Sequence, residues 1–392
     1  MFKYDVNSLV KALKFNSAEV LPNNDESLLK EVEVLVSNAN LTNSPINHYI
    51  GFEISGLVHV GTGIMTALKI KQLTDAGVIC HIWLANFHTY LNNKLDGKLE
   101  TIEKVRKEYF EPCMLKCLEI CDVDMTKVKL WDGITLYSQI TKDRDSFWMY
   151  DLDVCKNLTL SRVLKSISVT GKTQGDEVEF GTLRYPAMQV ADPFFMGVHI
   201  VHAGMDQRKC HVLMREIAFK LQPNHQLKIG SKPVKPIAIH HSLLLGLDKP
   251  KENDTEGSKM SKSKPDSAIF VHDSKEDLDK KLKKAYCPSY DHTLAKEINE
   301  SIQQSNPLLD WCKKMIFPAQ KTIHIEMLEI SKISKTYTDY ETLLSDYLLG
   351  EIFPTELKKA VSITLSTWFE QIKTWSDDNA AIIQYIKNIK KN

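Results

Sequence analysis

Residues 49–63 carry the first side chains and glycines whose spacing could support chemistry on a phosphorylated substrate. The segment places His59 among four glycines, which include Gly51 and Gly61. It predicts a short strand, a glycine-rich turn and then a helix. Glycine lets a backbone turn tightly or approach a ligand, and a helix N-terminus offers unpaired N–H groups to an anion. His59 could donate a hydrogen bond to a phosphate oxygen there, but an ordinary strand-to-helix turn with a surface histidine explains this segment alone equally well.

A second set of candidate residues lies around Pro186, which we expect in the first turn of a helix. Tyr185, Gln189 and Asp192 recur at helical spacing, so one face of this helix presents a phenol, an amide and a carboxylate. A solvated stripe on a surface helix would show the same pattern.

Residues 198–209 predict a strand, a glycine turn and a helix. Asp206 and Gln207 lie just past this strand, at the edge where open α/β sheets bind ligands. His199 and His202 are interpreted as strand and turn residues rather than as metal ligands.

Residues 247–265 have the composition of a mobile loop that carries Lys259, Lys262 and Lys264. Lysine is a movable point charge, so three ammonium groups on a flexible segment suit a transient clamp on phosphate. A solvated charged loop is the better explanation if this segment is considered alone.

Two further elements are needed to position these groups. Residues 78–86 form an apolar run after the predicted helix 63–76, so residues 49–86 predict a βαβ unit of a parallel sheet. His88 lies just past the second strand, again at the ligand-binding edge, although a structural histidine is equally consistent with that position.

The domain organisation follows from length and composition. With 392 residues, two domains are the default expectation. Residues 1–45 predict a helical N-terminal preamble, and residues 46–270 a catalytic domain with a helical insertion at about 92–180. Residues 271–392 are charged, lysine-rich and helical in pattern, which indicates a separate C-terminal domain.

Bulk properties exclude several classes of protein. The formal net charge is zero, so nucleic acid would have to bind local basic patches. No run predicts a membrane span or a secretory signal. The eight cysteines contain no CxxC pair, and Cys113, Cys117 and Cys121 fit buried thiols on one helical stripe better than a metal site. We therefore expect a cytoplasmic protein that binds no membrane and has no metal-ligating residues.

Taken together, the segments resemble class I aminoacyl-tRNA synthetases. His59-Val60-Gly61 resembles the first signature of the class, and Lys259-Met260-Ser261-Lys262-Ser263 the second. Within the class, the chain is similar to tyrosyl-tRNA synthetases of the archaeal and eukaryotic type over nearly its whole length. The segments that carry this closer resemblance are Tyr49, Tyr185-Pro-x-x-Gln189-x-x-Asp192, Gly204-x-Asp206-Gln207-Arg208-Lys209, residues 284–288 and residues 354–361.

The resemblance implies a fold and an activity. The fold would be a Rossmann-like, doubly wound parallel sheet with a helical insertion, followed by a mainly α-helical anticodon-binding domain. The activity would be that of a tyrosine–tRNA ligase, which activates L-tyrosine with ATP and Mg²⁺ and transfers the tyrosyl group to the 3′ end of tRNA(Tyr). The family also implies a homodimer.

The resemblance also implies roles for individual residues. Tyrosine would contact Tyr49, Tyr185, Gln189, Asp192 and Gln207. ATP would contact Gly51, His59, Gly61, His88, Asp206, Lys259 and Lys262, of which His59, Gly61, Lys259 and Lys262 would serve catalysis. The tRNA would contact Arg208, Lys209, Glu356 and Lys358.

The chain departs from the family pattern at several positions. Thr62 stands where many relatives have histidine, and Asn86 where relatives often have aspartate. Ile330–Ile333 falls about where relatives have an aromatic residue that stacks on the first anticodon base, and Glu356 stands where relatives have aspartate. Base stacking on an aromatic ring is worth ~1–3 kcal/mol, so the anticodon would be read more weakly or by a different arrangement.

Three other functions fit parts of this sequence pattern. A tryptophanyl-tRNA synthetase shares the fold and signatures, but the pair Tyr49 and Asp192 is suited to a phenol. A non-catalytic RNA-binding paralogue would have no use for the second signature. A nucleotidyltransferase acting on a small molecule would leave the lysine-rich C-terminal region without a role.

Overall fold

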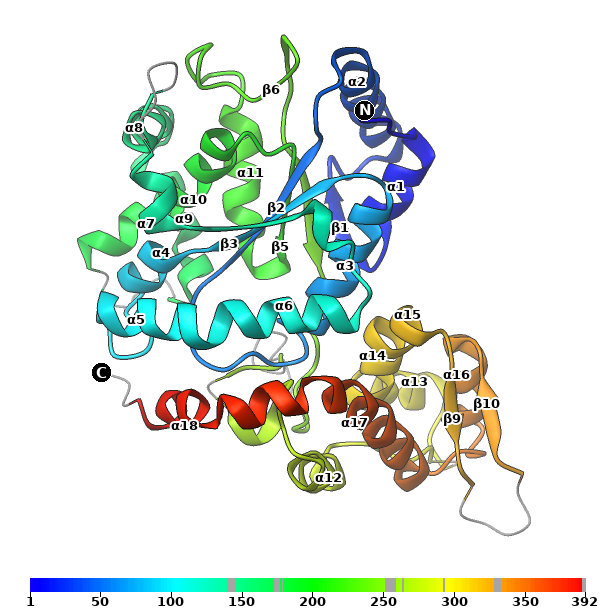
Figure 1. Cartoon of the computed structure of the whole chain (residues 1–392). Helices are drawn as coiled ribbons and strands as arrows, with labels where there is room; N and C mark the ends of the chain where they lie inside the picture. Colours follow the sequence, from blue (N-terminus) through cyan, green and yellow to red (C-terminus); the bar gives the residue numbers. More distant parts are fainter. Residues whose placement is uncertain are drawn as a thin grey trace.

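The computed structural model describes residues 1–139, 145–172, 177, 179–250, 259–262, 264–291, 293–327 and 333–389. Its centre is a six-stranded sheet in the order β1-β8-β5-β2-β3-β4, with helices on both faces (Figure 1). The strands are β1 (Ser17–Leu21), β2 (Asn47–Phe52), β3 (Ile79–Leu84), β4 (Val128–Asp132), β5 (Ile200–Gly204) and β8 (Ile237–His241).

The strand order reverses direction between β2 and β5. From β2 the chain proceeds outward through β3 to β4, whereas β5 is followed by β8 on the other side. These five strands are parallel, and only β1 pairs antiparallel, with β8. In such sheets the crevice at the carboxyl ends of the strands, at the point of reversal, is where ligands bind.

Helices surround the sheet and form its buried core with it. The helices before the signature loop are α1 (Val6–Lys14), α2 (Asp25–Thr42), α3 (Ile64–Asp75), α4 (Asn86–Leu91), α5 (Leu99–Val105), α6 (Glu111–Ile120), α7 (Gly133–Tyr137), α8 (Phe147–Asn157), α9 (Leu160–Ser166), α10 (Phe180–Met196) and α11 (Arg208–Ile217). A π-helical turn, Arg106–Phe110, joins α5 to α6.

Helix α3 packs closely on α6 because residue 63 is a glycine. A Cβ atom there would lie 2.5 Å from the Sγ of Cys117, one of the three buried cysteines of the expected stripe. The glycine-rich turn therefore serves packing as well as ligand approach.

The C-terminal region is mainly helical and lies below and to the right of α6 in Figure 1, where α17 passes alongside that helix. It comprises α12 (Lys275–Lys284), α13 (Lys296–Gln304), α14 (Pro307–Trp311), α15 (Phe317–Gln320), α16 (Tyr340–Leu348), α17 (Pro354–Asp378) and α18 (Ala380–Asn388), together with a hairpin of β9 (Ile323–Ile325) and β10 (Lys335–Tyr337). A parallel α/β sheet followed by a helical C-terminal part was predicted, and it is confirmed.

Two sheet strands and one helix start differ from the sequence prediction. Residues 1–45 are not only helical, because β1 lies between α1 and α2 and extends the sheet. The insertion at 92–180 contains β4, which pairs with β3. Helix α10 begins at Phe180, so Pro186 lies inside it rather than in its first turn. Among the described residues, no helix combines the length and the apolarity that a bilayer span requires.

Candidate active site

A cavity of about 290 Å³ opens at the carboxyl ends of β2 and β5, where the strand order reverses. Every residue predicted for tyrosine or ATP lines it. These residues are Tyr49, Gly51, His59, Gly61, His88, Tyr185, Gln189, Asp192, Asp206, Gln207, Lys259 and Lys262. Segments that are up to about 200 residues apart in the chain thus meet at the edge that the predicted parallel sheet indicated.

The deep end of the cavity is a polar cluster in an apolar wall. Asp192 is 1% exposed, and its Oδ1 accepts a 2.6 Å hydrogen bond from the hydroxyl of Tyr137. The Nε2 of His88 lies 3.6 Å from Oδ2 of the same carboxyl. Burial raises the pKa of Asp192 to about 8, so this carboxyl is mostly protonated at neutral pH and can donate as well as accept. Burial and the neighbouring Asp192 raise the pKa of the Tyr49 phenol, which stays neutral.

The middle of the cavity carries two amides. Gln189 Nε2 donates to Gln207 Oε1 at 3.2 Å, and Gln207 Nε2 donates to the carbonyl of Val169 at 3.0 Å. The Gln189 Oε1 atom is buried and has no hydrogen-bond partner among the described residues. A buried acceptor without a donor costs free energy, so a ligand with an N–H group at this point would be stabilised.

His59 holds one defined tautomer at the mouth of the cavity. The backbone N–H of Thr62 donates to its Nδ1 at 3.2 Å, so the proton lies on Nε2, 3.2 Å from the Thr62 hydroxyl. Burial, with the charge of Lys262, lowers the pKa of His59 to about 3, and the neutral ring is a hydrogen-bond donor. A Cβ at Gly61 would lie 3.1 Å from His59 Nδ1, so glycine keeps this ring in place. Thr62, a departure from the family pattern, thereby contacts both ring nitrogens.

Two lysines of the signature loop reach the same mouth. Lys259 Nζ lies 3.2 Å from Asp206 Oδ2. Lys262 Nζ donates to the hydroxyl of Ser55 at 3.1 Å, and burial lowers its pKa to about 8. Residues 251–258 and Ser263, which belong to the predicted loop 247–265, lie outside the described residues.

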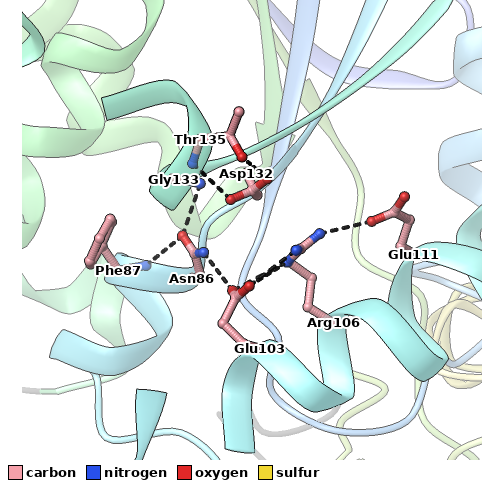
Figure 2. Close-up of polar contacts among 8 residues, drawn as sticks. All are labelled: Asn86, Phe87, Glu103, Arg106, Glu111, Asp132, Gly133 and Thr135. Carbon is pink, nitrogen blue, oxygen red and sulfur yellow. Dashed lines mark hydrogen bonds and ion pairs between the residues drawn. The ribbon is translucent and has the colours of Figure 1, made fainter. Parts of the chain in front are cut away.

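Asn86, the other departure near the site, is fully buried, and both its amide oxygen and its amide nitrogen form hydrogen bonds (Figure 2). Its Oδ1 accepts the backbone N–H groups of Phe87 at 3.0 Å and Gly133 at 2.9 Å. Its Nδ2 donates to Oε1 of Glu103 at 2.7 Å. The amide therefore ties the start of α4, which carries His88, to α5 and to the start of α7.

The residues predicted to meet tRNA do not line the cavity. Arg208 donates to both carboxylate oxygens of Glu19, at 2.7 and 2.9 Å, and Lys209 Nζ donates to the Ser168 hydroxyl at 2.8 Å. Lys358 lies on α17 and donates to the backbone carbonyl of residue 283 at 3.0 Å.

Glu356 also lies on α17, but its side chain is fully buried and accepts the N–H of Phe353 at 2.7 Å, which caps that helix. The carboxylate does not face the solvent, where a nucleic acid would bind. Of the segment Ile330–Ile333, only Ile333 lies within the described residues, and it is exposed.

Several residues of the site were missed by sequence reasoning. The hydroxyl of Tyr137 donates a hydrogen bond to Asp192, and the Tyr137 ring stacks on Phe147 with centroids 3.6 Å apart. Glu53 lines the cavity and accepts from Asn92 at 2.7 Å. Glu53 stands inside the first signature, so its place after β2 was a usable signal, whereas Tyr137 follows a strand that the sequence did not reveal.

No cluster of three or more histidine, cysteine or carboxylate side chains that could hold a metal occurs in the part of the chain that the structure describes.

Comparisons with known proteins agree with this geometry. The family model for tRNA synthetases class I (W and Y) matches residues 41–370. A tyrosine–tRNA ligase of Thermococcus sibiricus is 41% identical over 359 residues, which are 88% of this chain and 91% of that protein. A tyrosine–tRNA ligase of Thermococcus kodakarensis is 40% identical over 380 residues, 92% of this chain and 96% of that one.

Solved structures give the same result. The crystal structure of tyrosyl-tRNA synthetase complexed with L-tyrosine from Pyrococcus horikoshii matches with a TM-score of 0.85 and 36% identity, covering 98% of this chain and all of that one. A tryptophanyl-tRNA synthetase of Aeropyrum pernix matches with a TM-score of 0.61 and 16% identity, over 93% of this chain and 86% of that one, which is a likeness of fold alone.

Proposed function

The chain belongs to the tRNA synthetases class I (W and Y), and from this premise we propose that it acts as a tyrosine–tRNA ligase. The observation that carries the choice of tyrosine is the buried carboxyl of Asp192 beside Tyr49 at the closed end of the cavity. These polar groups suit a phenolic hydroxyl. A phenolic hydroxyl can both donate to and accept from them, whereas an indole N–H can only donate and phenylalanine has no polar atom to do either.

Rejection of phenylalanine follows from the same geometry. A site that hydrogen-bonds a substrate hydroxyl loses those bonds when the analogue lacks it, and tyrosine enzymes are the established example of this selectivity. The ammonium group of tyrosine would lie against Tyr185, Gln189 and Gln207. The Gln189 Oε1 atom would then gain the donor that it lacks among the described residues.

The first reaction joins tyrosine to AMP. An oxygen of the substrate carboxylate attacks the α-phosphorus of ATP, and the bond from that phosphorus to the bridging oxygen breaks, which releases pyrophosphate. The attacking carboxylate is already ionised, so the protein needs no general base and acts by positioning and charge stabilisation. His59 Nε2–H and the start of α3 would meet phosphate oxygens on one side, and Lys259 and Lys262 on the other.

Asp206 would bind the ribose hydroxyls, and His88 and Gly51 would border the bound nucleotide. Mg²⁺ would enter as part of the ATP complex. Mg²⁺ bound to nucleotides takes its ligands largely from phosphate and water, and the carboxylate of Asp206 is already paired with Lys259. In the second reaction, a hydroxyl of the terminal ribose of tRNA(Tyr) attacks the tyrosyl carbonyl, and AMP leaves.

The remaining assignments concern partners and location. We propose that Arg208 and Lys209 approach the acceptor end of the tRNA, for which Arg208 would exchange Glu19 for a phosphate. The helical C-terminal region, including Lys358, would contact the anticodon arm. We further propose that the enzyme is a homodimer of the cytoplasm, as its family implies.

ATP–pyrophosphate exchange tests the proposal. The assay uses the full chain with Mg²⁺ and no tRNA, and tyrosine, tryptophan and phenylalanine are supplied separately. Exchange with tyrosine alone is the expected result. Exchange with tryptophan would assign the tryptophan activity of the same family instead, and no exchange with any of the three would favour a non-catalytic RNA-binding protein.

A further inference from the structure

The π-helical turn Arg106–Phe110 directs two aromatic side chains toward the mouth of the cavity. A π turn inserts one residue into an α-helix, and such turns are often found at functional sites. Tyr109 and Phe110, the last two residues of this turn, are fully buried. Neither lines the cavity itself, but each contacts an element that does.

Phe110 lies under the ammonium group of Lys262. The distance from Nζ to the ring centroid is 5.2 Å, within the range of a cation–π interaction. Among the described residues, Lys262 forms no ion pair, whereas Lys259 is paired with Asp206. The ring and the Ser55 hydroxyl therefore hold the ammonium group without neutralising it, which leaves its charge available to an anion.

Tyr109 fixes the backbone just before His59. Its hydroxyl oxygen accepts the N–H of Val58 at 2.9 Å and lies 3.2 Å from Nδ1 of His272. Its ring lies 5.9 Å from that of Trp375 on α17. Without this hydroxyl, a buried N–H group in the glycine-rich turn would lose its acceptor.

The turn itself is firmly anchored. Arg106 is 7% exposed, and its Nη1 donates to Glu111 at 2.9 Å, while its Nε and Nη2 donate to Glu103 at 3.1 to 3.2 Å (Figure 2). Glu103 in turn accepts from Asn86 at the start of α4. The turn is therefore linked through Glu103 to the start of α4, the helix that carries the cavity residue His88.

We propose that the π-helical turn Arg106–Phe110 is a positioning element for the phosphates of ATP, in which Phe110 holds Lys262 and Tyr109 holds the backbone of Val58, directly before His59. The inference rests on the proposed function, because it assumes that Lys262 and His59 bind the phosphates of ATP. Phe110 and Tyr109 act through other residues, and neither touches the substrate.

The first test replaces the ring and keeps a hydrophobic side chain. Phe110→Leu should lower kcat/KM for ATP in tyrosine-dependent exchange by about 5- to 30-fold, the equivalent of a desolvated cation–π contact. Tyrosine binding, measured by fluorescence titration, should be unchanged, and Phe110→Tyr should restore most of the activity. Phe219→Leu is the matched control, because Lys235 lies 5.3 Å from the Phe219 ring outside the site, and it should behave like the native enzyme.

The second test removes only a hydroxyl. Tyr109→Phe should lower kcat/KM for ATP by about 5- to 10-fold, the equivalent of one hydrogen bond, without changing tyrosine binding. Tyr347→Phe removes another buried phenol hydroxyl, which donates to the carbonyl of Pro288 at 2.8 Å in the C-terminal region, and should leave kcat/KM for ATP unchanged. The inference would be overturned if kcat/KM for ATP and the affinity for tyrosine fell equally in these variants. It would also be overturned if kcat/KM for ATP fell in neither variant.

A third measurement does not depend on the enzymatic activity. Acylation of Lys262 by an amine-directed reagent, followed by mass spectrometry, should be severalfold faster in Phe110→Leu than in the native protein, because the ring no longer stabilises the ammonium form. An unchanged rate would overturn the role of Phe110. If the native chain shows no tyrosine-dependent exchange while this rate rises, the proposed function fails and the contact between Phe110 and Lys262 stands.

Discussion

At the scale of single residues, Asp192 shows how recognition conflicts with stability. Burial raises the pKa of its carboxyl to about 8, far above the value of about 4 in an unfolded chain. A group whose pKa is raised by folding contributes stability that is complete below its unfolded pKa and is lost as the pH rises through its folded pKa. The buried Asp192 carboxyl thus lowers the free energy of unfolding progressively as the pH rises from about 4 to about 8.

Asp192→Asn should therefore abolish tyrosine-dependent exchange and raise the free energy of unfolding at pH 8. We expect a gain of at least ~1.4 kcal/mol, the value of one pKa unit, because the amide cannot ionise. ATP binding should remain near the native value. Urea unfolding at pH 6 and pH 8 and equilibrium dialysis with ATP measure both effects.

The exposed Asp377 provides the control for this substitution. Asp377→Asn should change neither tyrosine activation nor the pH dependence of unfolding. If Asp192→Asn weakened ATP and tyrosine binding equally, the assignment of Asp192 to the phenol would be wrong.

Lys262 is the second residue whose environment sets its behaviour. Burial lowers its pKa to about 8; the neighbouring carboxylate of Glu53 opposes this effect, and Lys94 adds to it. Lys262 should therefore lose its positive charge as the pH rises above about 8. We expect kcat/KM for ATP, which reports the free enzyme, to fall on an alkaline limb near that pH.

Lys262→Arg keeps its charge throughout this range, so its alkaline limb should disappear even though its rate at pH 7 is lower. Exchange assays between pH 6.5 and 9.5 provide the measurement. An alkaline limb that persists unchanged in Lys262→Arg would assign it to another group.

At the scale of elements, the start of α4 depends on an amide at position 86. The Asn86 side chain accepts two backbone N–H groups and donates to the carboxylate of Glu103. An aspartate could still accept, but its second oxygen would face the Glu103 carboxylate without a proton between them.

Asn86→Asp should therefore lower the free energy of unfolding at pH 7.5 by about 1–3 kcal/mol, the cost of an unsatisfied buried polar contact. Glu103→Gln in the same chain should restore most of that loss, because the glutamine amide can donate to the new aspartate. A double-mutant cycle by urea unfolding measures the coupling, and additive losses would contradict the proposed contact.

The elements also show what sequence patterns can and cannot predict. Strands β2, β3 and β5 are central and largely buried, so they stand out as apolar runs, and the helix α10 aligns Tyr185, Gln189 and Asp192 on one face as its period requires. Strands β1 and β4 lie at the two edges of the sheet, where only part of each strand is buried. Their alternation is weak because tertiary pairing, rather than local pattern, makes them strands.

The same limit applies to contacts within the site. The cavity residues that the sequence predicted were recognisable because each lies in a motif of its own segment. Tyr137 and Phe110 were not, because they meet Asp192 and Lys262 only after long-range folding. A π turn has no period that marks it in the sequence.

At the scale of the whole molecule, buried histidines tie the stability of the fold to pH. Burial lowers their pKa values below the usual 6.5 or so, because the low-polarity interior disfavours the charged ring. The histidines concerned are His48, His59, His81, His88, His199, His202, His211, His240, His241 and His272. In the unfolded chain each of these would take up a proton near pH 6.5, so unfolding binds protons in this range.

Stability from such groups is complete above pH 6.5 and is lost as the pH falls toward their folded pKa values, which are about 4 for His81 and His241. Buried carboxyls with raised pKa values act in the opposite direction, but they are fewer: Glu53, Asp151, Asp192 and Asp273. We therefore expect the free energy of unfolding to fall steeply between pH 7 and pH 5. This loss should be spread over β2, β3, β5 and β8, which carry buried histidines, and should not arise at the active site alone.

His48 offers a direct test, because neither of its ring nitrogens has a partner among the described residues and its ring lies 5.4 Å from that of His202. His48→Leu should keep the stability at pH 7.5 and reduce the loss between pH 7 and pH 5 by about 2 kcal/mol, the cost of excluding one proton over that range. His324→Gln, at an exposed histidine, should leave the slope unchanged. Urea unfolding at half-unit steps of pH measures all three proteins, and an undiminished loss in His48→Leu would show that the acid sensitivity resides elsewhere.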